Sequence, residues 1–254
     1  RAVVCQRCWL MQTEDVVGRD ELFDAEYAYF SSYSTSWLQH AEAYVDRMVR
    51  DLRLGADDLV VEVASNDGYL LQYVLARGVG ALGIEPTADT AAAAHERGIA
   101  TVERFFGREV GHELAESGAR PRLMVANNVL AHVPDINDFV GGFAELLASD
   151  GVATFEFPHL LVLLRDGLYD TIYHEHFSYL SLGTVRRIFD ANGLQVVDVE
   201  ELPTHGGSLR VHAVQAASMR QVSSRVDELI RRESHAGLFS PDGYQHLQGL
   251  AGRT

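Results

Sequence analysis

Residues 59–68 read Leu-Val-Val-Glu-Val-Ala-Ser-Asn-Asp-Gly, an apolar run that passes directly into a polar turn. Such a run is typical of a strand that is buried on both faces, as the strands of parallel sheets are. Ligands of open α/β sheets bind beyond the carboxyl ends of the strands. We therefore expect the polar turn, which ends at Gly68, to contribute to a binding site.

The segments that follow alternate between apolar strands and amphipathic helices. The last two strands are joined by five residues, 203–207, and so short a loop favours an antiparallel hairpin over a crossover. The alternation predicts an α/β, Rossmann-like fold: a doubly wound, mostly parallel seven-stranded sheet with one antiparallel strand. The predicted strands are residues 59–63, 80–85, 99–102, 123–127, 152–157, 194–202 and 208–215. The predicted helices are residues 35–54, 70–77, 87–97, 107–117, 136–148 and 182–192, with one more in the C-terminal tail.

Composition narrows the class of protein. Hydrophobic residues make up 47% and charged residues 22% of the 254 residues, which is ordinary for a globular protein. No apolar run reaches the roughly 18 residues of a membrane span, and no signal-peptide pattern opens the chain, so we expect a cytoplasmic protein without a membrane partner. The net charge of −15 and the lack of a basic stripe argue against a nucleic-acid substrate.

The only two cysteines, Cys5 and Cys8, have the spacing C-x-x-C. In a cytosolic protein this spacing indicates half of a zinc site, a redox pair or two reduced thiols. Structural zinc takes four ligands, and no second cysteine pair follows in the chain. The chain also starts at Arg1 rather than at a methionine, so we expect a fragment whose other ligand pair lies upstream.

The turn at residues 62–68 favours S-adenosylmethionine (SAM) over a dinucleotide. A dinucleotide site would need the glycines of G-x-G-x-x-G, because pyrophosphate must approach bare backbone at a helix N-terminus. Only Gly68 is present, and SAM carries no pyrophosphate. Glu62, Asn66 and Asp67 can supply the polar contacts that its amino acid and nucleoside need.

Residues after the next strands strengthen this interpretation. Glu85 follows the second strand, where an acidic residue accepts both ribose hydroxyls. Each residue alone could equally belong to a turn or to the core, but the set in this order favours a SAM site. The other members are Phe105 and Phe106, expected to pack on adenine, and Asn127 and Asn128 after the fourth strand.

Five of the 11 histidines follow the fourth, fifth and sixth predicted strands and are expected at the same edge of the sheet. The densest group is Tyr173-His174-Glu175-His176, which can supply a general base, an orienting carboxylate and a phenol for an oxyanion. Imidazole titrates near neutral pH, so it suits removal of a proton from carbon. Two alternatives remain: a turn with surface histidines, and a metal site formed by His159, His174, His176 and His205.

From Cys5 to Gln215 the sequence resembles the C-methyltransferases of deoxysugar biosynthesis, which act on nucleotide-linked 4-keto-6-deoxyhexoses of antibiotics, usually at C3. The motifs that carry the resemblance are residues 62–68, Gly83-Ile84-Glu85-Pro86, Phe105-Phe106, 127–134, 173–177 and His205-Gly206-Gly207-Ser208-Leu209-Arg210. The resemblance implies a class I methyltransferase fold and identifies Cys5-x-x-Cys8 as the second half of that family's zinc site. Ala64 stands where related sequences often have glycine.

The resemblance also implies a mechanism. His176 would remove the C3 proton that the C4 ketone acidifies, while Tyr173 and Glu175 position the base or the substrate. His132 would hold the substrate or the enolate oxygen, and the enolate carbon would attack the SAM methyl group. The resemblance further places Ala64 and Pro86 at the cofactor, and His205, Arg210 and Tyr33 at the substrate, with Arg210 contacting phosphate unless it is an ordinary surface residue.

Four segments are expected on this basis: a zinc-region remnant at 1–23, a connector and helix at 24–56, the SAM-binding domain at 57–216, and the start of a truncated C-terminal region at 217–254. Two other functions stay open. One is an O- or N-methyltransferase of a small metabolite, which needs a base but no enolate stabiliser. The other is a scaffold that binds SAM without catalysis. The oligomeric state is not indicated.

Overall fold

The computed structural model describes residues 1–14, 18 and 29–244. The expected boundary at residues 23 and 24 and the last ten residues of the expected C-terminal segment lie outside this range. The chain divides into two compact units. The first unit comprises Arg1–Gly18, Asn127–Asn137 and Thr154–Thr254, and the second comprises Arg19–Ala126 and Asp138–Ala153.

The main sheet has the strand order β5-β4-β3-β6-β7-β10-β9. Strand β3 pairs in parallel with β4 and β6, β4 pairs in parallel with β5, and β9 and β10 form an antiparallel pair. This confirms the expected seven-stranded, mostly parallel sheet with a reversed strand. The strands are β3 (Leu59–Val63), β4 (Gly80–Ile84), β5 (Ala100–Val102), β6 (Leu123–Asn127), β7 (Val152–Pro158), β9 (Leu194–Leu202) and β10 (Ser208–Gln215).

Helices of the second unit pack on the buried strands by their apolar faces. Helix α2 begins after Ser34, whose hydroxyl caps the Trp37 N–H, and it ends at Leu52 because Arg53 turns into the left-handed region at φ 52°. The helix therefore ends two residues before the end of the expected range, 35–54. The helices are α2 (Thr35–Leu52), α3 (Leu71–Ala76), α4 (Ala88–Glu96) and α5 (Arg108–Glu116), and α6 (Ile136–Leu146) lies mostly in this unit.

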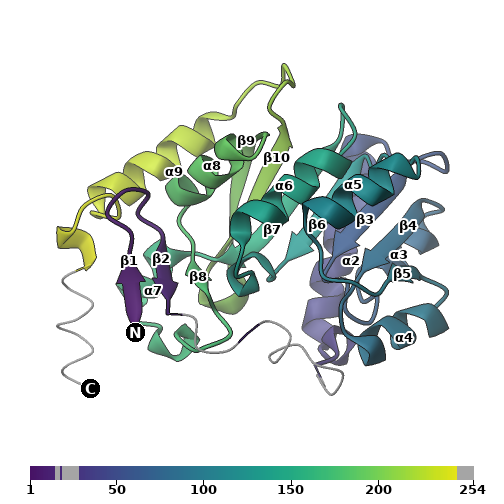
Figure 1. Ribbon diagram of the computed structural model, residues 1–254, viewed down its shortest axis with the longest axis horizontal. Coiled ribbons are helices and arrows are strands. Elements are labelled where there is room, and N and C mark those ends of the chain that lie inside the picture. The colour runs from purple at the N-terminus through teal and green to yellow at the C-terminus, as the bar shows by residue number, and fades with distance from the viewer. Residues whose placement is uncertain (15–17, 19–28, 245–254) are drawn as a thin grey trace. The chain divides into compact units, whose positions relative to one another are not determined.

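The first unit contains a second, three-stranded sheet that the sequence did not reveal (Figure 1). Its strands β1 (Ala2–Val4), β2 (Met11–Thr13) and β8 (Ser178–Tyr179) are all antiparallel and only two or three residues long. Strands this short show no readable alternation of apolar and polar residues. The helices of this unit are α7 (Leu160–Asp166), which was also missed, α8 (Leu182–Ala191) and α9 (Ser224–His235).

None of the helices in the described ranges combines the length and the apolar character that a bilayer crossing needs.

Candidate functional site

The turn after β3 passes through the left-handed region three times, at Ala64 (φ 55°), Asn66 (φ 51°) and Gly68 (φ 76°). A side chain at Gly68 would meet Ile99, because an added Cβ would lie 2.2 Å from the Ile99 Cδ1 atom. The backbone angle therefore favours glycine at this position, and a larger residue would also require the Ile99 side chain to shift. The left-handed conformation of Ala64 costs roughly 1 kcal/mol, whereas glycine adopts it freely. This agrees with the glycine expected there from the family resemblance.

The Glu85 carboxylate lies just beyond β4 and holds this turn in place. One of its oxygens accepts the Asn66 N–H at 2.8 Å, and the other accepts the Thr87 N–H at 3.0 Å and the Thr87 hydroxyl at 2.6 Å. Glu85 is buried. Since a carboxylate has about four acceptor positions, it retains capacity for a ligand hydroxyl while it fixes the turn.

Glu62 is fully buried at the end of β3. Burial raises the pKa of its carboxyl group well above the ordinary value, with repulsion from Glu85 and Asp67 adding to the shift. Neither oxygen accepts a hydrogen bond of good geometry, although the Tyr69 hydroxyl lies close enough to offset part of the pKa shift. The Ser65 hydroxyl and the Asp67 Oδ1 atom are also buried without a hydrogen-bond partner. Unsatisfied buried acceptors are costly, so their concentration here indicates a missing donor.

The segment before α2 is fastened to the same turn. The Asn66 side chain accepts the Ser31 N–H at 2.8 Å and donates to the Tyr29 carbonyl at 2.9 Å. Arg97 forms an ion pair with the Asp67 carboxylate at 3.0 Å and contacts the Ser32 hydroxyl. Tyr33, one of the expected substrate residues, is 81% exposed.

The expected aromatic and amide residues of the cofactor site differ in burial and are divided between the two units. Phe106 belongs to the core, because its ring meets those of Phe139 and Phe143 edge to face at 5.7 and 5.2 Å. This corrects its assignment to adenine. Phe105 is half-buried, as are Pro86 of the second unit and Asn128 of the first, and Asn127 of the first unit is buried. Asn128 has φ 55° and donates its N–H to the Glu156 carbonyl at 2.7 Å.

A cluster of imidazole and phenol groups forms in the first unit. The His176 Nδ1 atom lies 2.8 Å from the Thr171 carbonyl, and its Nε2 atom lies 3.1 Å from the Tyr173 hydroxyl. A carbonyl can only accept, so Nδ1 carries the proton and Nε2 presents its lone pair to the Tyr173 hydroxyl. The His132 and His176 rings meet at 4.6 Å. The ring orientation of His176 is thereby fixed, with Nε2 as the hydrogen-bond acceptor.

Burial shapes the protonation of this cluster. Burial, together with the neighbouring His176, lowers the pKa of His132 to about 4, although the Glu175 carbonyl favours the charged form, so His132 is neutral at pH 7. Burial also lowers the pKa of His176. The Thr171 carbonyl and Glu175 favour the charged form and offset part of this shift. Burial raises the pKa of Tyr173, with Glu175 adding to the effect. The cluster therefore combines neutral imidazoles with a protonated phenol at neutral pH.

Two residues expected at the open edge are buried instead. His159 is 1% exposed and lies 2.8 Å from the carboxylate of Glu233, a residue that the sequence did not single out. Arg210 is 3% exposed and forms an ion pair at 2.6 Å with Glu156. The expected contact of Arg210 with a substrate phosphate is therefore corrected, because this guanidinium neutralises a buried carboxylate. His205 is exposed, at φ 52°.

In the described ranges, no group of three or more His, Cys, Asp and Glu side chains is arranged to hold a metal ion. The described histidines thus give no support to the alternative of a histidine metal site. Cys5 and Cys8 lie half-buried in the turn between β1 and β2. Backbone N–H groups, that of Cys8 foremost, lower the pKa of the Cys5 thiol, whereas burial raises that of Cys8. Zinc binding by this pair stays a prediction.

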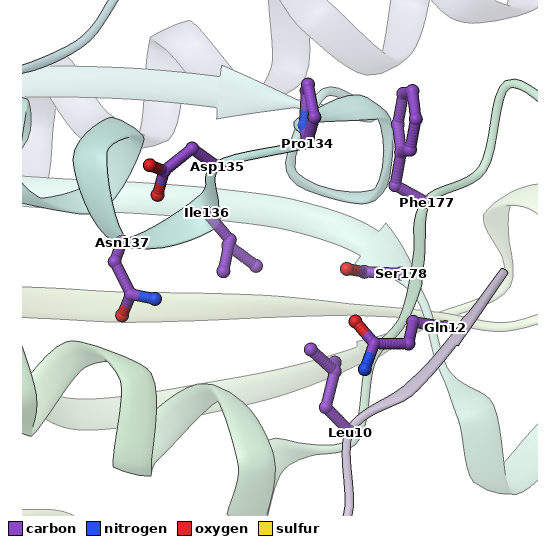
Figure 2. A pocket seen from close by; sticks show the side chains of 8 residues that line it. All are labelled: Leu10, Gln12, Pro134, Asp135, Ile136, Asn137, Phe177 and Ser178. Carbon is purple, nitrogen blue, oxygen red and sulfur yellow. The ribbon is translucent and has the colours of Figure 1, made fainter. Parts of the chain in front are cut away.

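A cavity of about 400 Å³ opens in the first unit (Figure 2). Gln12, Asp135 and Asn137 give it a polar lining, and Phe177, directly after His176, forms part of its wall. A lining of this kind suits a hydroxylated ligand better than an apolar one. Leu10, Pro134, Ile136 and Ser178 complete it.

Comparison with known proteins identifies relatives of both parts of the chain. The family described as "Methyltransferase domain" matches residues 37–199, and that described as "C-methyltransferase C-terminal domain" matches residues 203–253. The C-methyltransferase NovU of Streptomyces niveus is 40% identical over 245 residues, which cover 96% of this chain and 58% of that protein. The chain thus spans little more than half the length of this relative.

Solved structures agree on the fold. Magnesium protoporphyrin IX methyltransferase from Synechocystis PCC 6803, with bound SAH, has a TM-score of 0.54 at 18% identity over 70% of this chain and 83% of that chain. The YcgJ protein of Bacillus subtilis has a TM-score of 0.53 at 12% identity over 71% of this chain and 100% of that chain. Since the first family covers more than half of the sequence, the chain belongs to the methyltransferase-domain family.

Proposed function

We propose that the protein is a SAM-dependent C-methyltransferase that acts, through an enolate, at C3 of a nucleotide-linked 4-keto-6-deoxy sugar. The observation that carries the proposal is the His176 base, whose Nε2 lone pair faces the Tyr173 hydroxyl while its Nδ1 proton is held by the Thr171 carbonyl. The 40% identity to a relative named as a C-methyltransferase supports transfer to carbon. The nucleotide sugar is inferred from the family resemblance of the motifs.

The turn after β3 fits SAM. Glu62, Asp67 and Glu85 surround it with carboxylates, which attract the ammonium and hydroxyl donors of SAM and repel a pyrophosphate. The buried acceptors without partners at Glu62, Ser65 and Asp67 require such donors. When bound, SAM supplies an electrophilic methyl group on a sulfonium ion. We assign Glu85 to the ribose hydroxyls and Glu62, with the 64–68 turn, to the methionine part.

The proton is removed by His176. A ketone at C4 acidifies the neighbouring C–H bond, and a base removes it best when its pKa is close to the working pH. Because burial lowers the pKa of His176, the ring is unprotonated at neutral pH. The Thr171 carbonyl fixes the ring orientation, so Nε2 is the atom that receives the proton.

Tyr173 is the donor best suited to the enolate oxygen. Its raised pKa keeps the phenol protonated, and its hydroxyl already lies 3.1 Å from the His176 Nε2 atom. Glu175 favours the charged form of His176, and so stabilises the imidazolium once the proton has been transferred. The His132 Nδ1–H group donates a hydrogen bond to the Glu175 carbonyl at 3.0 Å. In the neutral ring, the His132 Nε2 atom is therefore an acceptor. We therefore assign His132 to a substrate hydroxyl rather than to the enolate oxygen.

The test is the identity of the bond that forms. The protein is incubated with SAM carrying a ¹³C methyl group and a nucleotide-linked 4-keto-6-deoxyhexose uniformly labelled with ¹³C in the sugar. We expect a one-bond carbon–carbon coupling between the methyl group and a ring carbon. A methyl carbon without that coupling means transfer to oxygen or nitrogen, and binding of SAM without any turnover means a scaffold. Either outcome contradicts the proposal.

A further inference from the structure

Glu156 is a carboxylate with no exposure to solvent, in the interior of strand β7. A buried charge is costly unless it is paired and hydrogen-bonded. Arg210 of the neighbouring strand β10 donates to one oxygen at 2.6 Å, and the Thr204 hydroxyl donates to the other at 2.9 Å. Both oxygens are thus engaged, one by a cation and one by a loop.

The loop that Thr204 begins, residues 204–207, has an unusual backbone. His205, Gly206 and Gly207 all have positive φ, at 52°, 79° and 135°. A non-glycine residue in this region is strained and persists only when its surroundings hold it there. The loop is fastened at both ends, by the Thr204 hydroxyl to Glu156 and by the Gly207 carbonyl, which accepts the His159 N–H at 3.0 Å.

The 204–207 loop lies against the segment that orients His176: a Cβ added to Gly206 would lie 3.0 Å from the Leu168 Cδ1 atom, and the Thr171 hydroxyl donates to the Leu168 carbonyl at 2.7 Å. The Thr171 carbonyl in turn holds the His176 Nδ1 atom at 2.8 Å. A charge at His205 also disfavours a charge on His176. His132 and Tyr173 contact the His176 ring at 4.6 and 4.3 Å between ring centroids, and Tyr179 lies at 6.1 Å. Glu175 is the acidic neighbour that favours the charged form of His176. The position of the 204–207 loop therefore contributes to the orientation and the electrostatic environment of His176.

We propose that Glu156 is a positioning residue for His176: through its hydrogen bond to Thr204 it fastens the 204–207 loop, which carries His205 and lies against the segment that orients His176, with Arg210 as the counter-ion that makes the buried carboxylate tolerable. The residue acts through the loop and touches no reacting atom. The importance of this for catalysis rests on the proposed function, whereas the fastening of the loop is independent of it.

Thr204→Val is the main test, because it removes the hydroxyl and keeps the shape of the side chain. The amides of Gly207, bonded to the Thr204 carbonyl at 2.9 Å, and of His159 report on the loop in hydrogen exchange. Loss of one hydrogen bond predicts that both exchange up to about tenfold faster. We also expect the His176 pKa, followed by NMR, to rise as His205 moves away, and the KM for the sugar nucleotide to increase more than kcat falls.

Glu156→Gln is a second variant, and Glu200→Gln is its matched control, since Glu200 pairs with His212 of β10 at 2.6 Å. The control should leave the exchange of Gly207 and the titration of His176 unchanged. The proposal is overturned if Thr204→Val changes neither the exchange of the Gly207 and His159 amides nor the titration of His176. It is also overturned if Glu156→Gln accelerates exchange uniformly through the first unit while Thr204→Val has no effect. Absence of methyl transfer to any ketosugar, with the exchange result intact, would contradict the proposed function alone.

Discussion

The turn after β3 and the cluster around His176 differ in their chemical groups and in how those groups are held in place. The turn uses carboxylates that are buried, and Glu85 fixes it through three hydrogen bonds to Asn66 and Thr87. The cluster uses imidazoles and a phenol, and Tyr173 is 39% exposed. Its rings are oriented by single bonds to backbone carbonyls, from His176 to Thr171 and from His132 to Glu175.

The difference follows from what each region has to do. A turn that recognises a fixed ligand gains affinity from being ordered in advance, because less entropy is lost on binding. A base must present a lone pair and change its protonation state during turnover, so the group that meets its lone pair, here the Tyr173 hydroxyl, has to give way to the substrate. Changes in the turn should therefore affect mainly cofactor affinity, and changes in the cluster mainly the rate.

Replacement of the base should have the largest effect. His176→Ala is expected to lower kcat by at least ~100-fold, the low end for a lost general base, with the Kd for SAM unchanged. His174→Ala is the control, because His174 is exposed and two residues away. Steady-state kinetics and calorimetry check both. Near-normal turnover in His176→Ala would remove this residue from the role.

Loss of the Glu85 carboxylate should show the opposite pattern. We expect Glu85→Ala to weaken SAM binding by about 1.5–3 kcal/mol, roughly ten- to a hundredfold, because charged hydrogen bonds are lost and the turn loses its anchor. At saturating SAM, kcat should stay within a few fold of the original. The exposed Glu103→Ala serves as the control in calorimetry. A large fall in kcat at unchanged Kd would break the division between the two regions.

The pH dependence sharpens the description of the cluster. A general base must be unprotonated, so kcat/KM should be constant above the His176 pKa and fall as the pH drops through it. Since that pKa is lowered from 6.5, activity should persist below pH 6.5. His205→Ala removes a neighbour that disfavours the charged form, so the pKa should rise and the acid limb should move to higher pH. A limb that moves to lower pH, or does not move, contradicts the assignment.

The smallest effect is expected in the turn itself. Ala64→Gly relieves a left-handed alanine, and we expect the free energy of unfolding to rise by about 0.5–1 kcal/mol. Chemical denaturation measures it, with the helical Ala91→Gly as a control of opposite sign. A loss of stability in Ala64→Gly would show that the turn is less strained than its φ of 55° indicates.

The main sheet was predictable because most of its strands are at least five residues long and apolar, and because β5, of three residues, falls within the regular alternation of strands and helices. Helix α8, for example, ends at Ala191, within one residue of the expected range 182–192. The small sheet was not, because strands of two or three residues carry no period, and neither was α7, a seven-residue helix that directly follows β7.

The sequence indicated where some candidate residues lie but not which partners they have, and their roles stay predictions. Glu85, expected after the second strand, does lie beside the turn. Phe106 and Arg210 were misassigned because sequence order shows which strand a residue follows, but not which partner its side chain finds. Glu233 and Glu156 were missed for the same reason: their partners, His159 and Thr204, are 74 and 48 residues away along the chain.

The central claim is that His176 removes a proton from carbon before the methyl group is transferred. The most direct test is to incubate the protein with SAM and a nucleotide-linked 4-keto-6-deoxyhexose deuterated at C3, and to follow the label by mass spectrometry. We predict that the methylated product has lost the deuterium to solvent, and that turnover by the protein is slower than with the protiated sugar. Methyl transfer with the deuterium retained at C3 would contradict the account.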